Sequence, residues 1–146
     1  MGLRPDGSIR WRIHLTHPPD AVYPLLATPG GRKRFWADSP EIGEDRVEFR
    51  FGDGSRLESR ILERDPPGRF VLTYFGGSRA EFDLADDGDG GTDVTLTERG
   101  VPETERSDNL AGWVSVLLGL KAAVELGADL RNHDPERSWD RDYVDV

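Results

Sequence analysis

The stretch Ser107–Leu130, SDNLAGWVSVLLGLKAAVELGADL, decides the fold class of this chain. It contains no proline, and its large apolar residues recur every three or four positions, as in an amphipathic α-helix. They are Leu110, Trp113, Val114, Leu117, Leu120 and Val124. Ser107 or Asp108 can cap the first turn, and about 24 residues rising 1.5 Å each give a helix of roughly 36 Å. A helix of this length can cross a whole β-sheet and is predicted to cover one.

The sheet is predicted upstream, where polar and apolar residues alternate with a period of two. Five consecutive strands are expected at Val47–Phe51, Arg56–Leu62, Phe70–Phe75, Arg79–Leu84 and Asp93–Arg99. Short turns rich in Gly, Pro and Asp separate them, which indicates an antiparallel meander. A sixth strand is expected at Ser8–Leu15, by the same alternation.

Two short helices are predicted between the first strand and the meander. Pro19–Leu26 carries apolar residues at helical spacing, and Arg32–Ala37 can form one further turn after a break at Thr28–Gly31. The order is therefore one strand, two short helices, five strands and one long helix. It predicts an α+β fold in which the long helix covers the apolar face of an antiparallel sheet.

Composition limits the classes to which the protein can belong. The 146 residues suffice for one domain, with its core expected over about residues 8–130 and an acidic tail over 132–146. The formal charge of -9 argues against nucleic-acid binding and against a polybasic membrane-surface protein. No apolar run approaches the roughly 20 residues of a membrane span. The absence of cysteine excludes disulfides and thiolate chemistry and suits a cytoplasmic location.

Local motifs add a family resemblance to this fold prediction. Four of them resemble successive motifs of the SRPBCC (START-like) superfamily: His17–Tyr23, Arg34–Trp36, Asp65–Tyr74 and Gly91–Thr97. Gly112-Trp113, followed by Leu117, Leu120 and Lys121, is similar to the final helix of one branch, the family homologous to the activator of the heat-shock protein 90 ATPase. The resemblance implies the helix-grip fold, a curved antiparallel sheet of about six strands wrapped around the long helix.

The resemblance leaves three kinds of function open, because one fold supports many. The leading hypothesis is binding of a small, largely apolar molecule in a cavity between sheet and helix, without a metal or other cofactor. The second is a cofactor-independent cyclase or dehydratase that uses Glu98 as its acid–base group, with Tyr74 or Ser59 orienting the substrate. The third is a cochaperone-like interaction module whose acidic surface or tail docks a basic protein partner. Both a monomer and a homodimer remain open.

Eight residues are candidates for the ligand-binding site, because they share the expected inner face or flank the expected opening of the cavity. They are Trp36, Phe49, Ser59, Tyr74, Phe82, Glu98, Trp113 and Leu117. The aromatic residues among them suit ordinary core packing equally well. Glu98 shares the apolar face of the last strand, where burial would favour its protonated form and suit proton transfer. Alternatively, Glu98 reaches solvent at the strand end or pairs with Arg99 or Arg60.

The strand Arg56–Leu62 has two chemically different faces. One carries Arg56, Glu58 and Arg60, and the other carries Leu57, Ser59 and Ile61. Burying three charged side chains is costly, so the charged face is expected outside and Ser59 inside.

No metal site is predicted. His14, His17 and His133 match no metal-binding spacing, and His14 shares the expected solvent face of its strand with two arginines. Asp86–Gly91 contains part of a calcium-loop pattern but lacks the distal glutamate. A solvated hairpin turn is expected there instead.

Overall fold

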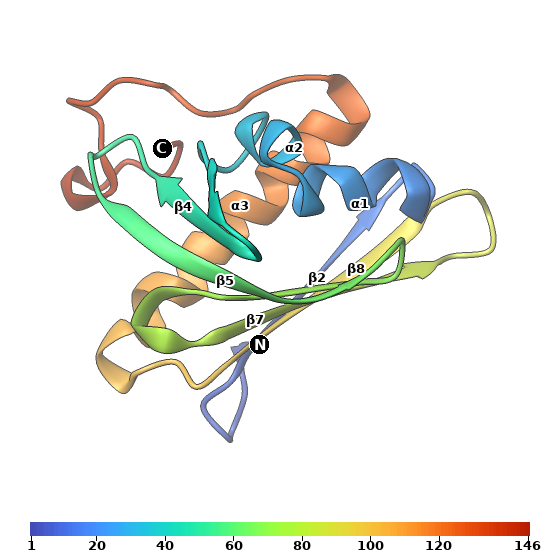
Figure 1. Ribbon diagram of the computed structural model, residues 1–146, viewed down its shortest axis with the longest axis horizontal. Helices are drawn as coiled ribbons and strands as arrows, with labels where there is room; N and C mark the ends of the chain where they lie inside the picture. The colour runs from blue at the N-terminus through green and yellow to red at the C-terminus, as the bar shows by residue number, and fades with distance from the viewer.

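An eight-stranded antiparallel sheet curves around one long helix in the computed structural model, which describes all 146 residues (Figure 1). The strands are β1 (Gly2–Leu3), β2 (Ile9–Leu15), β3 (Glu41–Gly43), β4 (Arg46–Arg50), β5 (Arg56–Asp65), β6 (Arg69–Thr73), β7 (Arg79–Asp86) and β8 (Thr92–Arg99). Their order across the sheet is β1-β2-β8-β7-β6-β5-β4-β3. The helices are α1 (Pro19–Ala27), α2 (Pro29–Lys33) and α3 (Arg106–Leu126). This architecture confirms the predicted helix-grip fold.

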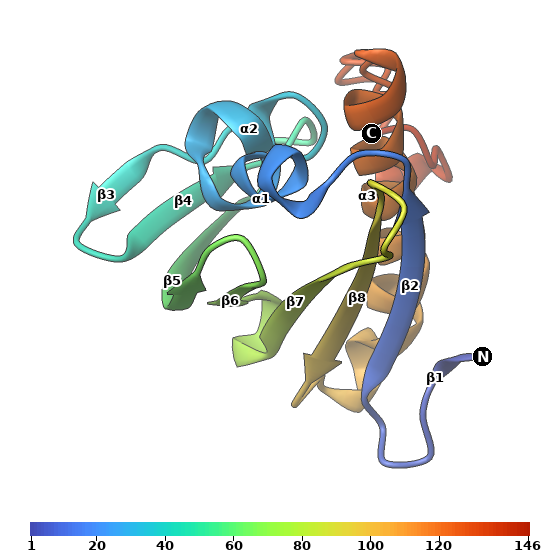
Figure 2. The ribbon, with the colours of Figure 1, turned by 90° about the vertical axis from the view of Figure 1, so that its right-hand side faces the viewer.

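The meander from β3 to β8 keeps its sequence order, and β2 closes it by pairing with β8 along its whole length. Helix α3 packs against β2, while α1 lies over β6 and β7 and contacts α2. Figure 2 shows all three helices on the same side of the sheet. One core of 25 buried residues joins these helices to the sheet.

The prediction of six strands missed the two shortest ones. β1 has two residues and β3 has three, and both lie at edges of the sheet. A segment this short cannot display a two-residue period, so its pairing is set by the neighbouring strand. β5 also runs beyond its predicted end to Asp65, past a register shift between Ile61 and Glu63.

Helix α2 begins where the sequence analysis expected a break, at Thr28–Gly31, and ends before most of the turn expected at Arg32–Ala37. The Thr28 hydroxyl accepts a hydrogen bond from the backbone N–H of Gly31 at 3.0 Å, and proline occupies the first helical position. Both features are typical of a helix start. The Thr-Pro pair therefore starts a helix instead of separating two elements.

Helix α3 ends four residues earlier than predicted, because Gly127 adopts the left-handed conformation (φ 61°) that terminates helices. Neither Ser107 nor Asp108 caps its start, which follows directly from a 3₁₀ turn at Glu103–Glu105.

By length and mean hydropathy, Glu103–Leu126 is sufficient to cross a membrane, which the sequence analysis did not anticipate. Its buried residues are those of a core helix: Trp113, Leu117, Gly119, Leu120, Ala122 and Ala123. Gly119 permits a close approach, because a Cβ there would lie 3.2 Å from the carbonyl oxygen of Phe35. The helix is therefore held tightly against the segment that follows α2.

Candidate functional site

Five of the candidate aromatic residues form one packed cluster between α3 and the sheet. Trp36 lies at its centre, with ring centroids 4.9 Å from Phe49, 5.7 Å from Tyr74, 5.9 Å from Phe82 and 5.6 Å from Trp113. The Trp36 indole N–H donates to the Tyr74 hydroxyl at 3.2 Å, and burial raises the pKa of Tyr74. These rings fill the interior between helix and sheet, so any ligand must lie beside the cluster.

A cavity of about 580 Å³ lies beside this cluster. Its walls come from α3, the end of β4 with the turn that follows it, the segment after α2, Phe75, and the chain beyond α3. Trp36, Tyr74 and Trp113 belong both to the cluster and to the cavity wall. The aromatic cluster is therefore the floor of the cavity.

The structure divides the eight candidate residues into two groups. Trp36, Tyr74 and Trp113 line the cavity. Phe49, Phe82 and Leu117 are buried behind it, and so are Ser59 and Glu98. The Ser59 hydroxyl is buried without a hydrogen-bond partner. A role in ligand binding stays a prediction for all eight.

Glu98 points into the protein, as the alternation along its strand predicted, and its side chain is fully buried. Its carboxylate accepts hydrogen bonds from the Ser78 hydroxyl at 2.5 Å, the Trp113 indole N–H at 2.8 Å and the Asn109 amide at 3.2 Å. No basic side chain pairs with it, so the alternative of pairing with Arg99 or Arg60 is wrong. Since Trp113 and Asn109 both line the cavity, Glu98 holds two residues of its wall by hydrogen bonds.

The charged face of β5 points outward, as predicted, and Ser59 points inward. On that outer face Glu58 pairs with Arg46 at 2.5 Å, and Arg56 pairs with Glu48 at 3.1 Å. These pairs form a cross-strand charge ladder on the surface, so the charged side chains of β5 lie on the face of the sheet opposite the core.

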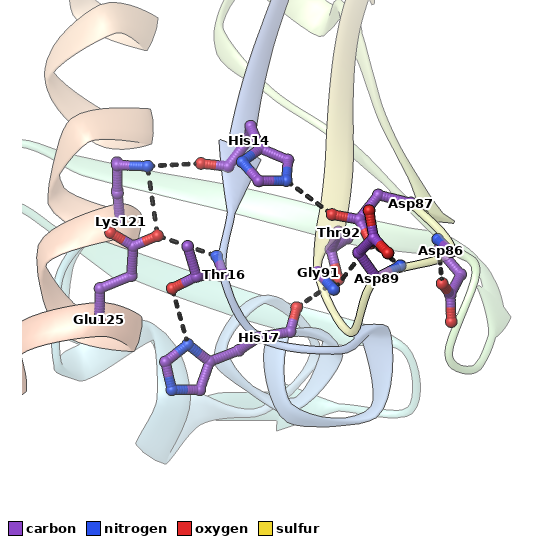
Figure 3. Close-up of polar contacts among 11 residues, drawn as sticks. His14, Thr16, His17, Asp86, Asp87, Asp89, Gly91, Thr92, Lys121 and Glu125 are labelled. Atoms are coloured by element: carbon purple, nitrogen blue, oxygen red, sulfur yellow. Dashed lines mark hydrogen bonds and ion pairs between the residues drawn. The ribbon is translucent and has the colours of Figure 1, made fainter.

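Polar residues at the C-terminal end of β2, around His14, form a separate network, shown in Figure 3. His14 contacts Asp87 at 2.7 Å, and this hydrogen bond, together with the backbone N–H groups of Asp89 and Gly91, lowers the pKa of Asp87 to about 2. Lys121 of α3 donates to the backbone oxygen of His14 at 2.6 Å. The network thus fastens β2 to the β7–β8 turn and to α3.

This network holds no metal-binding cluster. No group of three or more His, Asp or Glu side chains in the molecule is arranged to hold a metal ion. The segment Asp86–Gly91 is a hydrogen-bonded turn in which Asp86 and Asp87 accept backbone N–H groups of the turn itself. His14 is half-exposed, in agreement with the surface position predicted for it.

Sequence reasoning missed further residues of the cavity wall, most of which lie outside the long helix and the strands. They include Phe51, Phe75, Leu118, Leu130, Trp139 and Val144. Trp139 and Val144 lie in the acidic tail, where an aromatic and an aliphatic residue among many charged ones were the available signal. The acidic tail predicted over residues 132–146 thus contributes a wall of the cavity.

Comparison with known proteins identifies the family. The family model described as "Activator of Hsp90 ATPase homolog 1-like protein" matches residues 16–125. The Aha1 dimer from Colwellia psychrerythraea is 26% identical, with a TM-score of 0.73 over 82% of this chain and 97% of that chain. CalU16 from Micromonospora echinospora is 25% identical, with a TM-score of 0.68 over 84% of this chain and 79% of that chain.

A third structure shares the fold at lower identity. Protein SSP2350 from Staphylococcus saprophyticus is 23% identical, with a TM-score of 0.70 over 83% of this chain and 93% of that chain. No curated protein matches the chain. The match over residues 16–125 confirms the resemblance drawn from the sequence motifs: the chain belongs to the Activator of Hsp90 ATPase homolog 1-like family.

Proposed function

We propose that the protein binds a small, largely apolar molecule in the cavity beside the aromatic cluster. The observation that carries this proposal is the cavity itself, whose volume of about 580 Å³ lies in the range of small-molecule sites. Its floor is aromatic, and Asn109 and Ser115 of α3 supply polar groups that can orient a ligand. An apolar surface with a few polar groups is the usual composition of such a site.

The apolar side chains around the cavity support the same proposal. Leu118 and Leu130 are 51% and 52% exposed, although both line the cavity. An apolar ligand would remove this surface from water, which is favourable by roughly 25 cal/mol for each Å² buried. Exposed apolar residues gathered on one concavity are typical of a binding site.

Filling the cavity tests the proposal. Gly112 lines it from α3, and a Cβ at this position would meet no atom within 4 Å. Gly112→Leu should weaken binding of the neutral fluorescent probe N-phenyl-1-naphthylamine at least tenfold, because its side chain occupies ligand space. The helix itself should become more stable, by about 1 kcal/mol from the removal of glycine.

Gly112→Ala is the matched control, because it brings the same gain in helix propensity with a single methyl group. Its probe affinity should stay within about twofold of the original protein. Failure of the unaltered protein to bind the probe saturably would overturn the proposal, and so would equal affinity of the leucine variant.

We also propose that the protein forms a homodimer. The relative from Colwellia psychrerythraea was solved as a dimer, and the sequence leaves monomer and dimer open. Analytical ultracentrifugation should then give twice the chain mass of 16.3 kDa. A mass of one chain at all concentrations would contradict a homodimer.

A further inference from the structure

The chain beyond α3 closes on itself to form a compact unit, the C-terminal loop (Asn132–Val146). The Asn132 backbone N–H donates to the Asp145 backbone oxygen at 2.7 Å, and the Asn132 amide donates to the Asp145 carboxylate at 3.0 Å. These two bonds bring the ends of the loop together, as in an Ω-loop. A short 3₁₀ turn at Trp139–Arg141 lies between them.

The polar contacts of the C-terminal loop stay inside the chain beyond α3. Its ion pairs join Asp134 to Arg137 and Glu136 to Arg141, and His133 contacts Asp129 at 2.7 Å. No hydrogen bond or ion pair connects the loop to the sheet or to any of the three α-helices. The loop can therefore move away from the sheet and the helices without breaking a hydrogen bond to them.

The base of the loop, in contrast, is fixed. The Arg131 guanidinium donates to the backbone oxygen of Lys33 at 2.5 Å and to the Asp129 carboxylate at 3.0 Å. Burial opposes ionisation of Asp129, but hydrogen bonds from Arg131 and His133 lower its pKa to about 2. Arg131 is thus anchored at neutral pH, and the first residue free to move is Asn132.

The loop presents apolar side chains to the cavity. Trp139, Val144 and Val146 all line it, facing a wall to which α3 contributes Leu118. Val144 and Val146 remain 66% and 39% exposed, so their contact with the body is incomplete. A ligand in the cavity would be enclosed between α3 and the loop and would bury these side chains.

We propose that the C-terminal loop is a hinged cover of the cavity that opens between Arg131 and Asn132, and that Trp139, Val144 and Val146 select the ligand by its size. The proposal rests on the proposed ligand binding and extends it to residues outside the family match, which ends at residue 125. Opening separates apolar contacts with the body and strains one polar contact, between His133 and Asp129 at the base of the loop, whereas closing over a ligand buries additional apolar surface. The ligand therefore stabilises the closed position.

The first test measures probe kinetics on the full chain. Val144→Ser combined with Val146→Ser removes apolar wall from side chains that are already exposed, so the fold should be unaffected. Stopped-flow fluorescence with N-phenyl-1-naphthylamine should show dissociation at least fivefold faster than from the unaltered protein. Tyr143→Ser is the matched control, since Tyr143 is 40% exposed in the same loop and does not line the cavity.

The second test measures opening directly by limited trypsin digestion. Arg137 and Arg141 are exposed cleavage sites within the loop, and Arg99, at the end of β8, is an exposed site that does not line the cavity. Saturating probe should slow cleavage at Arg137 and Arg141 at least fivefold and leave cleavage at Arg99 unchanged.

The outcomes separate the two proposals. Probe binding with equal dissociation rates in the Val144/Val146 variant and the unaltered protein would overturn the cover while leaving ligand binding intact. Unchanged cleavage at Arg137 and Arg141 with bound probe would do the same. Absence of saturable probe binding to the unaltered protein would overturn ligand binding itself.

Discussion

Arg32 is a fully buried cation without a carboxylate partner. Its guanidinium donates to the Ser39 hydroxyl at 2.7 Å and to the Leu26 backbone oxygen at 2.9 Å, and it lies 5.8 Å from the centre of the Phe49 ring. One of its terminal nitrogens has no partner. Burial, together with repulsion from Arg64, lowers the pKa of Arg32 to about 10. Arg32 thus has both paired and unpaired nitrogens in the core, whereas the buried Glu98 has hydrogen bonds to three side chains.

Two buried serines, one without and one with a hydrogen-bond partner, allow the effect of such pairing on stability to be measured. The Ser59 hydroxyl has no partner, so Ser59→Ala should raise the free energy of unfolding by about 1 kcal/mol. Ser78→Ala should lower it by about 1–3 kcal/mol, because Ser78 donates to the buried Glu98. Urea denaturation of both variants checks the pair. Destabilisation of equal size in both would show that Ser59 has a partner after all.

The hydrogen bonds of Glu98 lead to a second prediction at this scale. Two of its three partners, the N–H groups of Trp113 and Asn109, can only donate, so in Glu98→Gln the new amide N–H group could be accepted only by the Ser78 hydroxyl, which would lose its own bond to residue 98. Stability should fall by about 1–3 kcal/mol, and the fluorescence of Trp113 should change because the acceptor of its N–H changes from a carboxyl group to an amide. An unaltered unfolding midpoint together with unaltered fluorescence would argue against these hydrogen bonds of Glu98.

At the scale of the element, helix α2 is short and is held by its packing against α1. Gly30 and Gly31 are neighbours in this helix, but only Gly31 faces α1 closely. A Cβ on Gly31 would lie 2.2 Å from the Pro24 backbone oxygen, whereas one on Gly30 would meet nothing within 4 Å. The two glycines therefore serve different purposes in the same turn.

Alanine substitutions distinguish these two glycines. Gly31→Ala should destabilise the protein by at least about 2 kcal/mol, because backbone atoms of α1 must move. Gly30→Ala should stabilise it by up to about 1 kcal/mol through helix propensity. Thermal unfolding of the two variants should shift in opposite directions, and a shared direction would contradict the contact between α1 and α2.

At the scale of the whole molecule, the acidic side chains are engaged by hydrogen bonds and arginines. Eight carboxyl groups have a pKa below the ordinary value: Asp6, Glu48, Glu81, Asp87, Glu125, Asp129, Asp134 and Asp140. No carboxyl group has a resolved shift in the opposite direction. Eight of the 28 acidic side chains are therefore held more strongly in the ionised form by the folded state.

The lowered pKa values of these carboxyl groups predict how the stability of the protein depends on pH. A carboxyl group with a lowered pKa binds fewer protons in the folded state, so its stabilisation is complete above the ordinary pKa values of 3.8 and 4.5. It is lost as the pH falls toward about 2, the pKa of Asp87 and Asp129. Urea denaturation should give a lower free energy of unfolding at pH 3 than at pH 5. The free energy of unfolding of Asp87→Asn should fall less between pH 5 and pH 3 than that of the unaltered protein. A larger fall in this variant would contradict the lowered pKa of Asp87.

The sequence predicted the architecture well because the core follows periodic patterns. The alternation in β8 correctly predicted that Glu98 points inward. The free-energy cost of burying charges correctly predicted that Arg56 and Glu58 point outward. Tyr74 and Trp113 are identified by their place in this pattern, and Trp36 by its position in the short segment expected at the opening; all three line the cavity. The other five candidates share the same face but lie deeper, and depth within a core has no signature in periodicity.

The cavity wall beyond α3 was not predictable by these means. The C-terminal loop depends on the bond between Asn132 and Asp145, a contact between residues that no repeating pattern links. Trp139 and Val144 are single apolar residues among charged ones, which suits a disordered tail as well as an ordered loop. The start of α2 was missed for a related reason, because Thr28 and the following proline serve equally in turns and in helix caps.

The position of the chain ends has a practical consequence for handling the protein. Val146 is part of the cavity wall, whereas Met1 is fully exposed, and the two chain ends lie well apart in both views (Figures 1 and 2). An affinity tag or fluorescent fusion joined after Val146 would begin at the opening of the binding site and hinder the closing of the loop. The same tag placed before Met1 would leave that opening clear, so ligand screens should use protein tagged at its N-terminus.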